Sequence, residues 1–344
     1  MTLLAEIHEQ PDRLRGLLSQ RSQVEQIASA IQRRAPCFVF LAARGTSDNA
    51  GRYANYLWGA ANRMPLALAT PSLFTYYQQP PTLKQALVVA VSQSGQSPDI
   101  IQVIQEGQRQ GCLTLAITNA PHSPLAQASE LVLDVQAGEE KAIAATKSFT
   151  AELLAIAMLS AALAGDETAW QEMESVPGWA AEMLNQEQAI ARIAQRYRYM
   201  NQCVVLGRGY NYATAFEWAL KLKELTYLVA EPYSSADFQH GPIAMVEGGF
   251  PVMAVAPQGK VYSSMLAMLT TLRHQHAAEL VVISNQDEAL SLAQSPVRLP
   301  GGIPEWLTPI PAIIAGQLFA YHLTLAKGYN AEAPRGLRKV TETN

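Results

Sequence analysis

The stretch Gln85-Ala-Leu-Val-Val-Ala-Val-Ser-Gln-Ser-Gly-Gln-Ser97 joins an unbroken apolar run to a turn of serine, glutamine and glycine. Such a run predicts a strand buried on both faces, as in parallel sheets. Apolar residues at helical spacing follow from about Pro98 to Gln110, and a further apolar run begins at Leu113. Strands that alternate with helices predict a parallel sheet with helices on both faces.

The same order of segments appears before this stretch and again in the second half of the chain. An apolar run from Cys37 ends at Arg44-Gly-Thr-Ser47, and a helical run over Ala50–Ala60 follows it. The second half repeats the three strands and their turns at Cys203–Gly209, Pro251–Gly259 and Leu280–Asn285. We therefore predict an α/β protein made of two tandem copies of one domain. Each copy is expected to be a doubly wound, flavodoxin-like parallel sheet flanked by helices.

Length and charge agree with two domains and exclude some functions. A chain of 344 residues has the length of about two domains. A formal net charge of −4 argues against a general nucleic-acid binder, which usually carries a basic patch. The three cysteines, Cys37, Cys112 and Cys203, show no spacing typical of a disulfide framework or a zinc site. Their pattern indicates a reducing compartment, so we expect a cytoplasmic protein.

Neither end nor middle of the chain predicts a membrane segment. The N-terminal stretch carries Glu6 and Glu9 and lacks the basic start and apolar middle of a signal peptide. The longest apolar run, Leu153–Gly165, is too short to span a bilayer. We expect it to form a buried helix, and we expect no membrane and no nucleic acid among the partners.

The turn Ser92-Gln-Ser-Gly-Gln-Ser97 has the composition of a phosphate site. It places hydroxyls and free backbone N–H groups at the start of a helix, where the dipole favours an anion. Serine also favours ordinary helix caps, so an N-capping turn is the alternative. The similar turn Gly45-Thr-Ser47 after the neighbouring strand favours phosphate. The motifs typical of dinucleotide and nucleoside triphosphate sites do not occur.

Candidate acid–base residues fall in the second half. On a helix expected over Thr214–Val229, Glu217, Lys221 and Glu224 have the spacing i, i+4 and i+7, which places them on one face. A solvated charge stripe is one interpretation. The many apolar and aromatic neighbours favour a packed helix, in which a carboxylate beside a lysine suits proton transfer. A loop histidine such as His240 is by itself more often structural.

Several motifs occur in a fixed order along nearly the whole chain: Arg44-Gly-Thr-Ser47, Ser92–Ser97, Ala137-Gly-Glu-Glu140 with Ala145-Thr-Lys-Ser-Phe149, and Lys221-Leu-Lys-Glu224 with His240-Gly-Pro242. Together they resemble the sugar isomerase (SIS) family, with the isomerase half of glucosamine-6-phosphate synthases as the nearest branch. The resemblance implies that seven residues hold the phosphate and hydroxyls of the substrate: Gly45, Thr46, Ser47, Ser92, Gln93, Ser94 and Ser97.

The resemblance also implies catalytic roles. Glu224 would move the proton with Lys221 beside it, and His240, from a neighbouring subunit of a homodimer, would open the sugar ring. Lys339, in a tail that closes over the sugar, would form a Schiff base with the open-chain carbonyl. Ile143 and Ala145 would line the sugar pocket. A lysine so near the C-terminus is normally solvated, and Arg335 and Arg338 are the alternative to Lys339 as local positive charge. No metal and no cofactor are implied.

We divide the chain into an N-terminal segment (1–22), a first SIS domain (23–165), a connecting helix (166–190), a second SIS domain (191–329) and a closing tail (330–344). Serine-rich turns occur only in the first copy and the acid–base residues only in the second. We therefore expect one active site shared by the copies.

Two differences from the glucosamine-6-phosphate synthases determine which reaction we expect. The sequence contains no glutaminase half, and Ala145 stands where the synthases usually carry serine. We expect an isomerase/deaminase that converts glucosamine 6-phosphate, or a close relative, to fructose 6-phosphate and ammonia, or runs in reverse with free ammonia. A fructosamine-6-phosphate deglycase, for which the small Ala145 leaves room, and a non-catalytic sugar-phosphate sensor are the alternatives.

Overall fold

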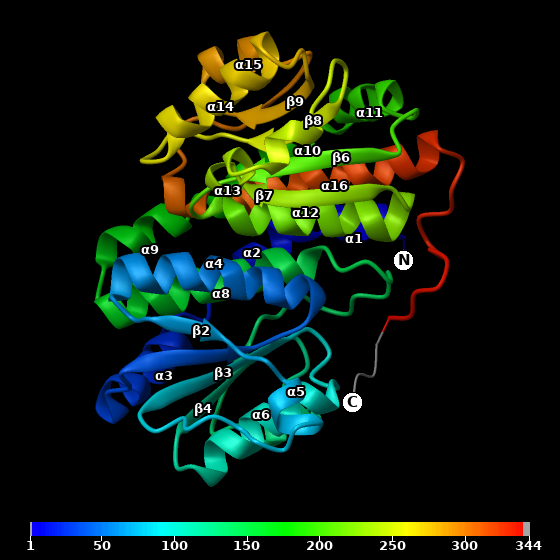
Figure 1. The fold of residues 1–344 in the computed structure, drawn as a ribbon. Helices are drawn as coiled ribbons and strands as arrows, with labels where there is room; N and C mark the ends of the chain where they lie inside the picture. The colour runs from blue at the N-terminus through cyan, green and yellow to red at the C-terminus, as the bar shows by residue number, and fades with distance from the viewer. Residues whose placement is uncertain (1, 340–344) are drawn as a thin grey trace. The chain divides into compact units, whose positions relative to one another are not determined.

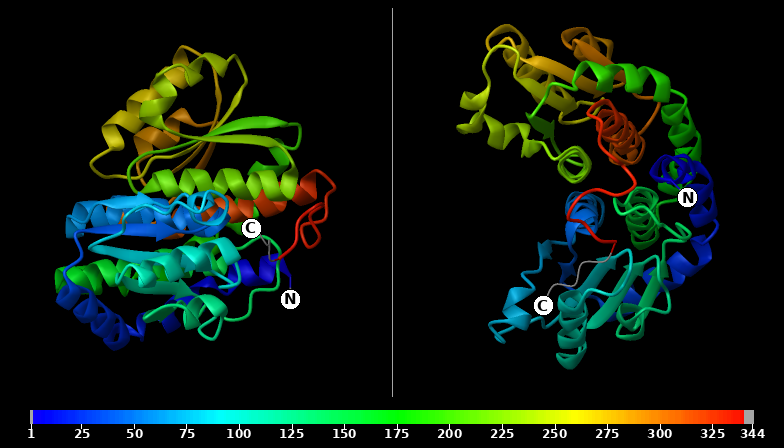
Figure 2. Two further views of the ribbon diagram at one scale, coloured as in Figure 1. Left: turned by 60° about the horizontal axis from the view of Figure 1, so that its bottom comes forward. Right: turned by 90° about the vertical axis from the view of Figure 1, so that its right-hand side faces the viewer.

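A computed structural model describes residues 2–339 and divides the chain into two compact units. Unit A comprises Glu9–Lys141, Lys147–Ser175 and the chain from Arg338 onward. Unit B comprises the chain up to His8, Ala142–Thr146 and Val176–Leu337. Each unit contains one five-stranded parallel sheet with helices on both faces (Figures 1 and 2).

The sheet of unit A has the order β2-β1-β3-β4-β5, and every neighbouring pair is parallel. Its strands are β1 (Phe38–Ala42), β2 (Leu66–Leu68), β3 (Ala86–Ser92), β4 (Leu113–Thr118) and β5 (Leu131–Asp134). All residues of β3 and β4 are buried, as their unbroken apolar runs predict. The edge strands β2 and β5 were not predicted, because three or four residues are too few to show a pattern.

Two groups of helices cover the two faces of this sheet. One group contains α3 and α4 packed on α8, and the other contains α5, α6 and α7 (Figure 1). The helices are α2 (Gln10–Leu18), α3 (Arg21–Arg34), α4 (Gly45–Asn62), α5 (Ser72–Thr75), α6 (Pro98–Arg109), α7 (Pro124–Gln127), α8 (Lys147–Ala164) and α9 (Glu167–Met173). The apolar side chains of α6 close one core against β3 and β4.

The sheet of unit B repeats this order. It runs β10-β9-β8-β6-β7, which matches the first sheet when β6 corresponds to β1 and β7 to β2. Its strands are β6 (Gln202–Gly207), β7 (Val229–Ser234), β8 (Pro251–Val255), β9 (Glu279–Ser284) and β10 (Ser295–Arg298). The expectation of a duplicated, doubly wound α/β fold is confirmed.

The helices of unit B again lie on two faces. On one face α12 packs on α16, and on the other face α14 packs on α15 and closes a core against the sheet. The elements are α1 (Leu3–His8), α10 (Val176–Leu184), α11 (Glu187–Arg196), α12 (Asn211–Thr226), α13 (Ser235–Gln239), the 3₁₀ turn η1 (Pro242–Met245), α14 (Tyr262–His274), α15 (Asp287–Leu292), η2 (Glu305–Leu307) and α16 (Pro309–Ala326).

Two expected helices differ from the structure. The segment 166–190 holds α9, α10 and the start of α11, not one connecting helix; Pro177 lies in the first turn of α10, where its missing N–H is tolerated, and so marks a helix start. The helix expected over Thr214–Val229 ends at Thr226. Tyr227 adopts a left-handed conformation (φ 60°) there, and Val229 begins β7.

Two segments are long and apolar enough to cross a membrane, namely α8 (Lys147–Ala164) and Glu305–Ala326. Helix α8 begins before the run Leu153–Gly165 and is therefore longer than the apolar run seen in the sequence. The expectation that its length excludes a membrane span is wrong. Most of each segment is buried inside the fold. The run Leu153–Gly165 accordingly forms a buried core helix, as predicted.

Candidate active site

The two serine-containing turns of unit A meet at one point of the sheet. Strands β1 and β3 are neighbours, with Ala42 paired to Ala90, and the turns Arg44–Ser47 and Ser92–Ser97 follow their carboxyl ends. From β1 the chain continues to β2 on one side, and from β3 to β4 on the other. Ligands of doubly wound sheets bind at such a switch point.

The turn after β3 leaves polar groups available to an anion. Ser97 occupies the N-cap position of α6 but makes no side-chain capping hydrogen bond, so the interpretation of a plain capping serine does not fit it. The Ser92 Oγ accepts the Gly95 N–H at 3.1 Å, which closes the turn. Gly95 has φ +62°, and a Cβ there would lie 2.0 Å from the Ser123 Oγ, so only glycine fits. Gln93 and Ser94 are half-buried beside it.

The turn after β1 is constrained by a buried carboxylate. Gly45 and Thr46 open α4, and Ser47 follows them as a buried residue. The Ser47 hydroxyl donates to the Glu152 Oε1 at 2.9 Å. A hydroxyl that donates its proton to a carboxylate cannot donate it to a phosphate as well. Ser47 is therefore suited to bind a phosphate through its backbone N–H, a distinction that the sequence does not show.

An ion pair that is not evident from the sequence connects the two turns. The Arg44 guanidinium contacts the Asp99 Oδ2 through Nε at 2.8 Å and through Nη2 at 2.7 Å. The Asp99 side chain is only 1% exposed, whereas the Arg44 side chain is half exposed. Arg44 thus presents its remaining donors at the carboxyl edge of the sheet, next to both turns. Arg44 is the first residue of the motif Arg44–Ser47, and this position was the signal in the sequence that could have indicated a functional role.

Lys339 belongs to unit A and lies against the loop that follows β5. Its Nζ is 3.1 Å from the Oε2 of Glu140, whose side chain is fully buried. Glu140 is part of the motif Ala137–Glu140, but the sequence does not reveal a role for it. Arg338 is exposed, and residues 340–344 of the expected closing tail lie outside the described residues.

In unit B the acid–base candidates form a row along α12. The Lys221 Nζ lies 2.6 Å from the Glu224 Oε2 and 3.3 Å from the Glu217 Oε1. The side chains of Lys221 and Glu217 are buried, and that of Glu224 is 23% exposed. The packed helix, not the solvated stripe, is the correct interpretation. Glu224 is the member of the row that solvent or a substrate can reach.

The two carboxylates keep Lys221 charged. Burial by itself lowers the pKa of this ammonium, but the attraction of Glu217 and Glu224 outweighs burial and raises the pKa above its ordinary value. The charged ammonium of Lys221 lies 2.6 Å from the carboxyl group of Glu224, so this positive charge faces the candidate base.

His240 does not lie beside Glu224. Glu224 is in the last turn of α12, near Val229, where β7 begins, and His240 follows α13, which starts after β7 ends. Strand β7 is roughly 17 Å long at about 3.3 Å per residue. Figure 1 shows α13 at the opposite end of β7 from the end of α12. Within unit B the structure therefore does not bring these two residues together.

The residues expected to line the sugar pocket lie in the segment Ala142–Thr146 of unit B. Ile143 and Ala145 are half-buried and alternate with the buried Ala144 and Thr146. The carboxylate of Glu6 accepts the Ala142 N–H, and the Thr146 carbonyl accepts the side-chain amide of Gln317 at 3.2 Å. These hydrogen bonds hold both ends of the segment. Between them, the half-buried side chains of Ile143 and Ala145 are the ones that a ligand can reach.

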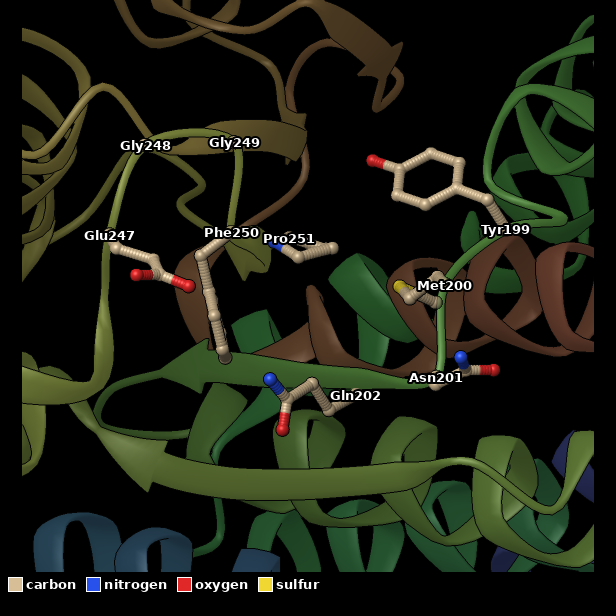
Figure 3. Close-up of a pocket in the computed structure, with 9 residues that line it drawn as sticks. All are labelled: Tyr199, Met200, Asn201, Gln202, Glu247, Gly248, Gly249, Phe250 and Pro251. Carbon is tan, nitrogen blue, oxygen red and sulfur yellow. The ribbon is translucent and has the colours of Figure 1, made fainter.

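A pocket of about 280 Å³ in unit B contains none of the predicted site residues (Figure 3). It lies where β6 and β8 begin. Tyr199 and Phe250 supply its aromatic rings and Glu247 its carboxylate, and Tyr199 and Glu247 are exposed. No lining residue combines charge with burial, so the pocket does not indicate a second active centre.

A doubly wound domain with a hydroxyl-rich turn at its switch point defines a class of α/β proteins suited to bind an anionic ligand at that point. The SIS domain model matches residues 37–162 and 197–327, and the chain belongs to the SIS domain family. Both matches contain the strands β1, β3 and β4 or their counterparts in unit B. The family resemblance predicted from the motifs is thereby confirmed.

Similar proteins include the glutamine–fructose-6-phosphate aminotransferase of Thermus thermophilus, 32% identical over 351 residues, which cover 98% of this chain and 58% of that protein. The C-terminal domain of glucosamine-fructose-6-phosphate aminotransferase from Francisella tularensis has a similar structure, with a TM-score of 0.85, 26% identity and coverage of 96% of this chain and 98% of that one. A glucosamine-6-phosphate deaminase from Thermotoga maritima shares the fold, with a TM-score of 0.76, 22% identity and full coverage of both chains. This chain thus spans about 58% of the length of the curated relative.

Proposed function

We propose that this protein is an aldose–ketose isomerase of amino-sugar phosphates, which converts glucosamine 6-phosphate and water to fructose 6-phosphate and ammonia, or runs in reverse with free ammonia. The observation that carries the proposal is the buried row on α12. In it the ammonium of the buried Lys221 lies 2.6 Å from the Oε2 of the partly exposed Glu224. Similarity to aminotransferases that act on fructose 6-phosphate supports this substrate class.

The chemistry requires little beyond a phosphate site and one base. The turns Arg44–Ser47 and Ser92–Ser97 bind the phosphate at the switch point of unit A. Glu224 moves a proton from C2 to C1 of the open-chain sugar, which converts the C2 amine to an imine. Water then hydrolyses the imine, which leaves the ketose and releases ammonia. That both groups act on one substrate molecule stays a prediction from the sequence.

Ring opening is assigned to His240 of a second copy of the chain. Glu224 and His240 of one chain lie toward opposite ends of β7. A homodimer in which each site takes Glu224 from one chain and His240 from the other supplies both groups. The imidazole of a histidine can both accept and donate a proton, as ring opening requires.

The test is to incubate the purified chain with glucosamine 6-phosphate and to measure ammonia and fructose 6-phosphate. We expect equal amounts of both products. We expect Glu224→Gln to lower kcat by about 10²–10⁴-fold, the usual contribution of one acid–base group. Glu231→Gln removes an exposed carboxylate of β7 and is the matched control, with kcat unchanged.

Other outcomes favour the alternatives. Turnover confined to fructosamine 6-phosphates would replace the deaminase with a deglycase, for which the small side chain of Ala145 leaves space. Tight binding of sugar phosphates without any turnover would replace both with a sensor. Equal activity of the wild-type protein and the Glu224→Gln variant would contradict the role of Glu224.

A further inference from the structure

Glu140 is a buried carboxylate that the reaction scheme leaves without a role. Its side chain is fully buried, yet its Oε2 lies 3.1 Å from the Nζ of Lys339, 199 residues away in the sequence. The Lys339 side chain is 26% exposed. A buried acidic group thus contacts Lys339. By the family resemblance, this lysine forms a Schiff base with the carbonyl of the open-chain sugar.

The backbone that carries Glu140 is fastened at three points. Asn119 accepts the Ala137 N–H at 2.8 Å and donates to the Gly138 carbonyl at 2.7 Å. The buried Lys147 donates to the Glu139 carbonyl at 2.7 Å. The Lys147 Nζ is held in turn by the Glu9 carboxylate at 2.8 Å. The position of Glu140 is therefore set by the core of unit A and does not depend on Lys339.

The carboxylate itself is also oriented. Its two oxygens accept the backbone N–H of Ser148 at 3.1 Å and the Ser148 hydroxyl at 2.8 Å. Ser148 is in the first turn of α8, so the carboxylate lies at the positive end of that helix. An oriented, desolvated carboxylate holds an ammonium in a defined place more effectively than an exposed one does.

We propose that Glu140 is a positioning residue for the proposed reaction: it holds the ε-amino group of Lys339 where the carbonyl of the open-chain sugar must approach. The proposal rests on the proposed function and on the Schiff-base role that the family resemblance implies for Lys339. A misplacement of about 1 Å of such a group can cost about 10²-fold in rate. Glu140 acts through Lys339 and does not itself contact the substrate.

The chain offers a closely matched pair of variants for the test. Glu140→Gln removes the charge, and the amide oxygen can still accept from Ser148. Glu139→Gln changes the adjacent residue, whose side chain is 76% exposed and pairs only loosely with Lys141. We expect kcat to fall about 10²-fold in Glu140→Gln with KM little changed, and we expect Glu139→Gln to match the wild type.

A double-mutant cycle separates positioning from a structural role. If Glu140 acts through Lys339, Glu140→Gln lowers kcat about 10²-fold in the wild type and has little further effect in a Lys339→Met background. If Glu140 only caps α8, the two effects multiply and the proposal is overturned. Thermal unfolding of each variant identifies any loss of fold.

Limited trypsin digestion tests the contact without any activity measurement. Cleavage after Arg338 and Lys339 needs a segment that is free to enter the protease. We expect release of the C-terminal peptide to be several-fold faster in Glu140→Gln than in Glu139→Gln or the wild type. Faster cleavage in a protein that turns over no sugar phosphate would support the contact and refute the proposed function. Unchanged cleavage together with a multiplicative cycle would refute the positioning role.

Discussion

Lys221 shows at the scale of one residue how burial changes the meaning of a charge pattern. The spacing of Glu217, Lys221 and Glu224 is that of an ordinary surface stripe, but the ammonium is buried and contacts both carboxylates. Glu217 is completely buried, so Lys221 places a compensating positive charge beside a carboxylate in the core. Lys221 therefore has a structural role in addition to its contact with Glu224.

We expect Lys221→Met to destabilise the protein by about 3–5 kcal/mol, because it leaves a buried carboxylate without its counter-ion. Lys223→Met, on the exposed side of the same helix, should change the free energy of unfolding by no more than about 0.5 kcal/mol. Urea unfolding measures both. The double variant Glu217→Gln/Lys221→Met should regain part of the lost free energy of unfolding. Equal effects of Lys221→Met and Lys223→Met would contradict the structural role of Lys221.

The place of Glu224 depends at the scale of elements on the packing of α12 against α16. Trp218 of α12 lies against Phe319 of α16, with ring centroids 5.7 Å apart. Gly316 of α16 allows this close approach, since a Cβ there would lie 2.9 Å from the Trp218 Cγ. The indole ring is rigid and buried and cannot yield as a flexible side chain does.

We expect Gly316→Ala to destabilise the protein by about 1–3 kcal/mol through overpacking against Trp218. Gly59→Ala is the matched substitution in α4, where a Cβ would have no neighbour within 4 Å. It should stabilise by about 0.5–1 kcal/mol, because alanine favours a helix over glycine. Thermal unfolding compares the two, and a stabilised Gly316→Ala variant would show that the helices do not pack this closely.

The separation of Glu224 and His240 has a consequence at the scale of the whole molecule. If each site takes one residue from each chain of a homodimer, a chain that lacks one residue can be complemented by a chain that lacks the other. A dimer of Glu224→Gln and His240→Asn chains then contains one intact site and one that lacks both groups. Each variant alone contains none.

We expect the two inactive variants, once coexpressed and allowed to exchange, to regain about one quarter of the wild-type activity. Random pairing makes half of the dimers mixed, and each mixed dimer has one intact site of two. Sedimentation establishes the oligomeric state in the same sample. Full activity of a protein that stays monomeric, or no recovery in proven mixed dimers, would place both residues in one chain.

The sequence by itself determined the layout of the fold. The apolar runs of β1, β3 and β4 and their counterparts are long enough to identify buried parallel strands, and their repetition identified two copies. The edge strands, such as β2, escaped prediction because three residues carry no period. The order of the motifs along the chain identified the family.

Only the tertiary structure decided which side chains meet at the candidate site. Arg44 and Asp99 are 55 residues apart, Ser47 and Glu152 are 105 apart, and Glu140 and Lys339 are 199 apart. No local pattern links such pairs, because a side-chain contact depends on where the sheet places each turn and on what burial forces to pair. The same sheet placed Glu224 and His240 toward opposite ends of one strand, which their closeness in sequence concealed.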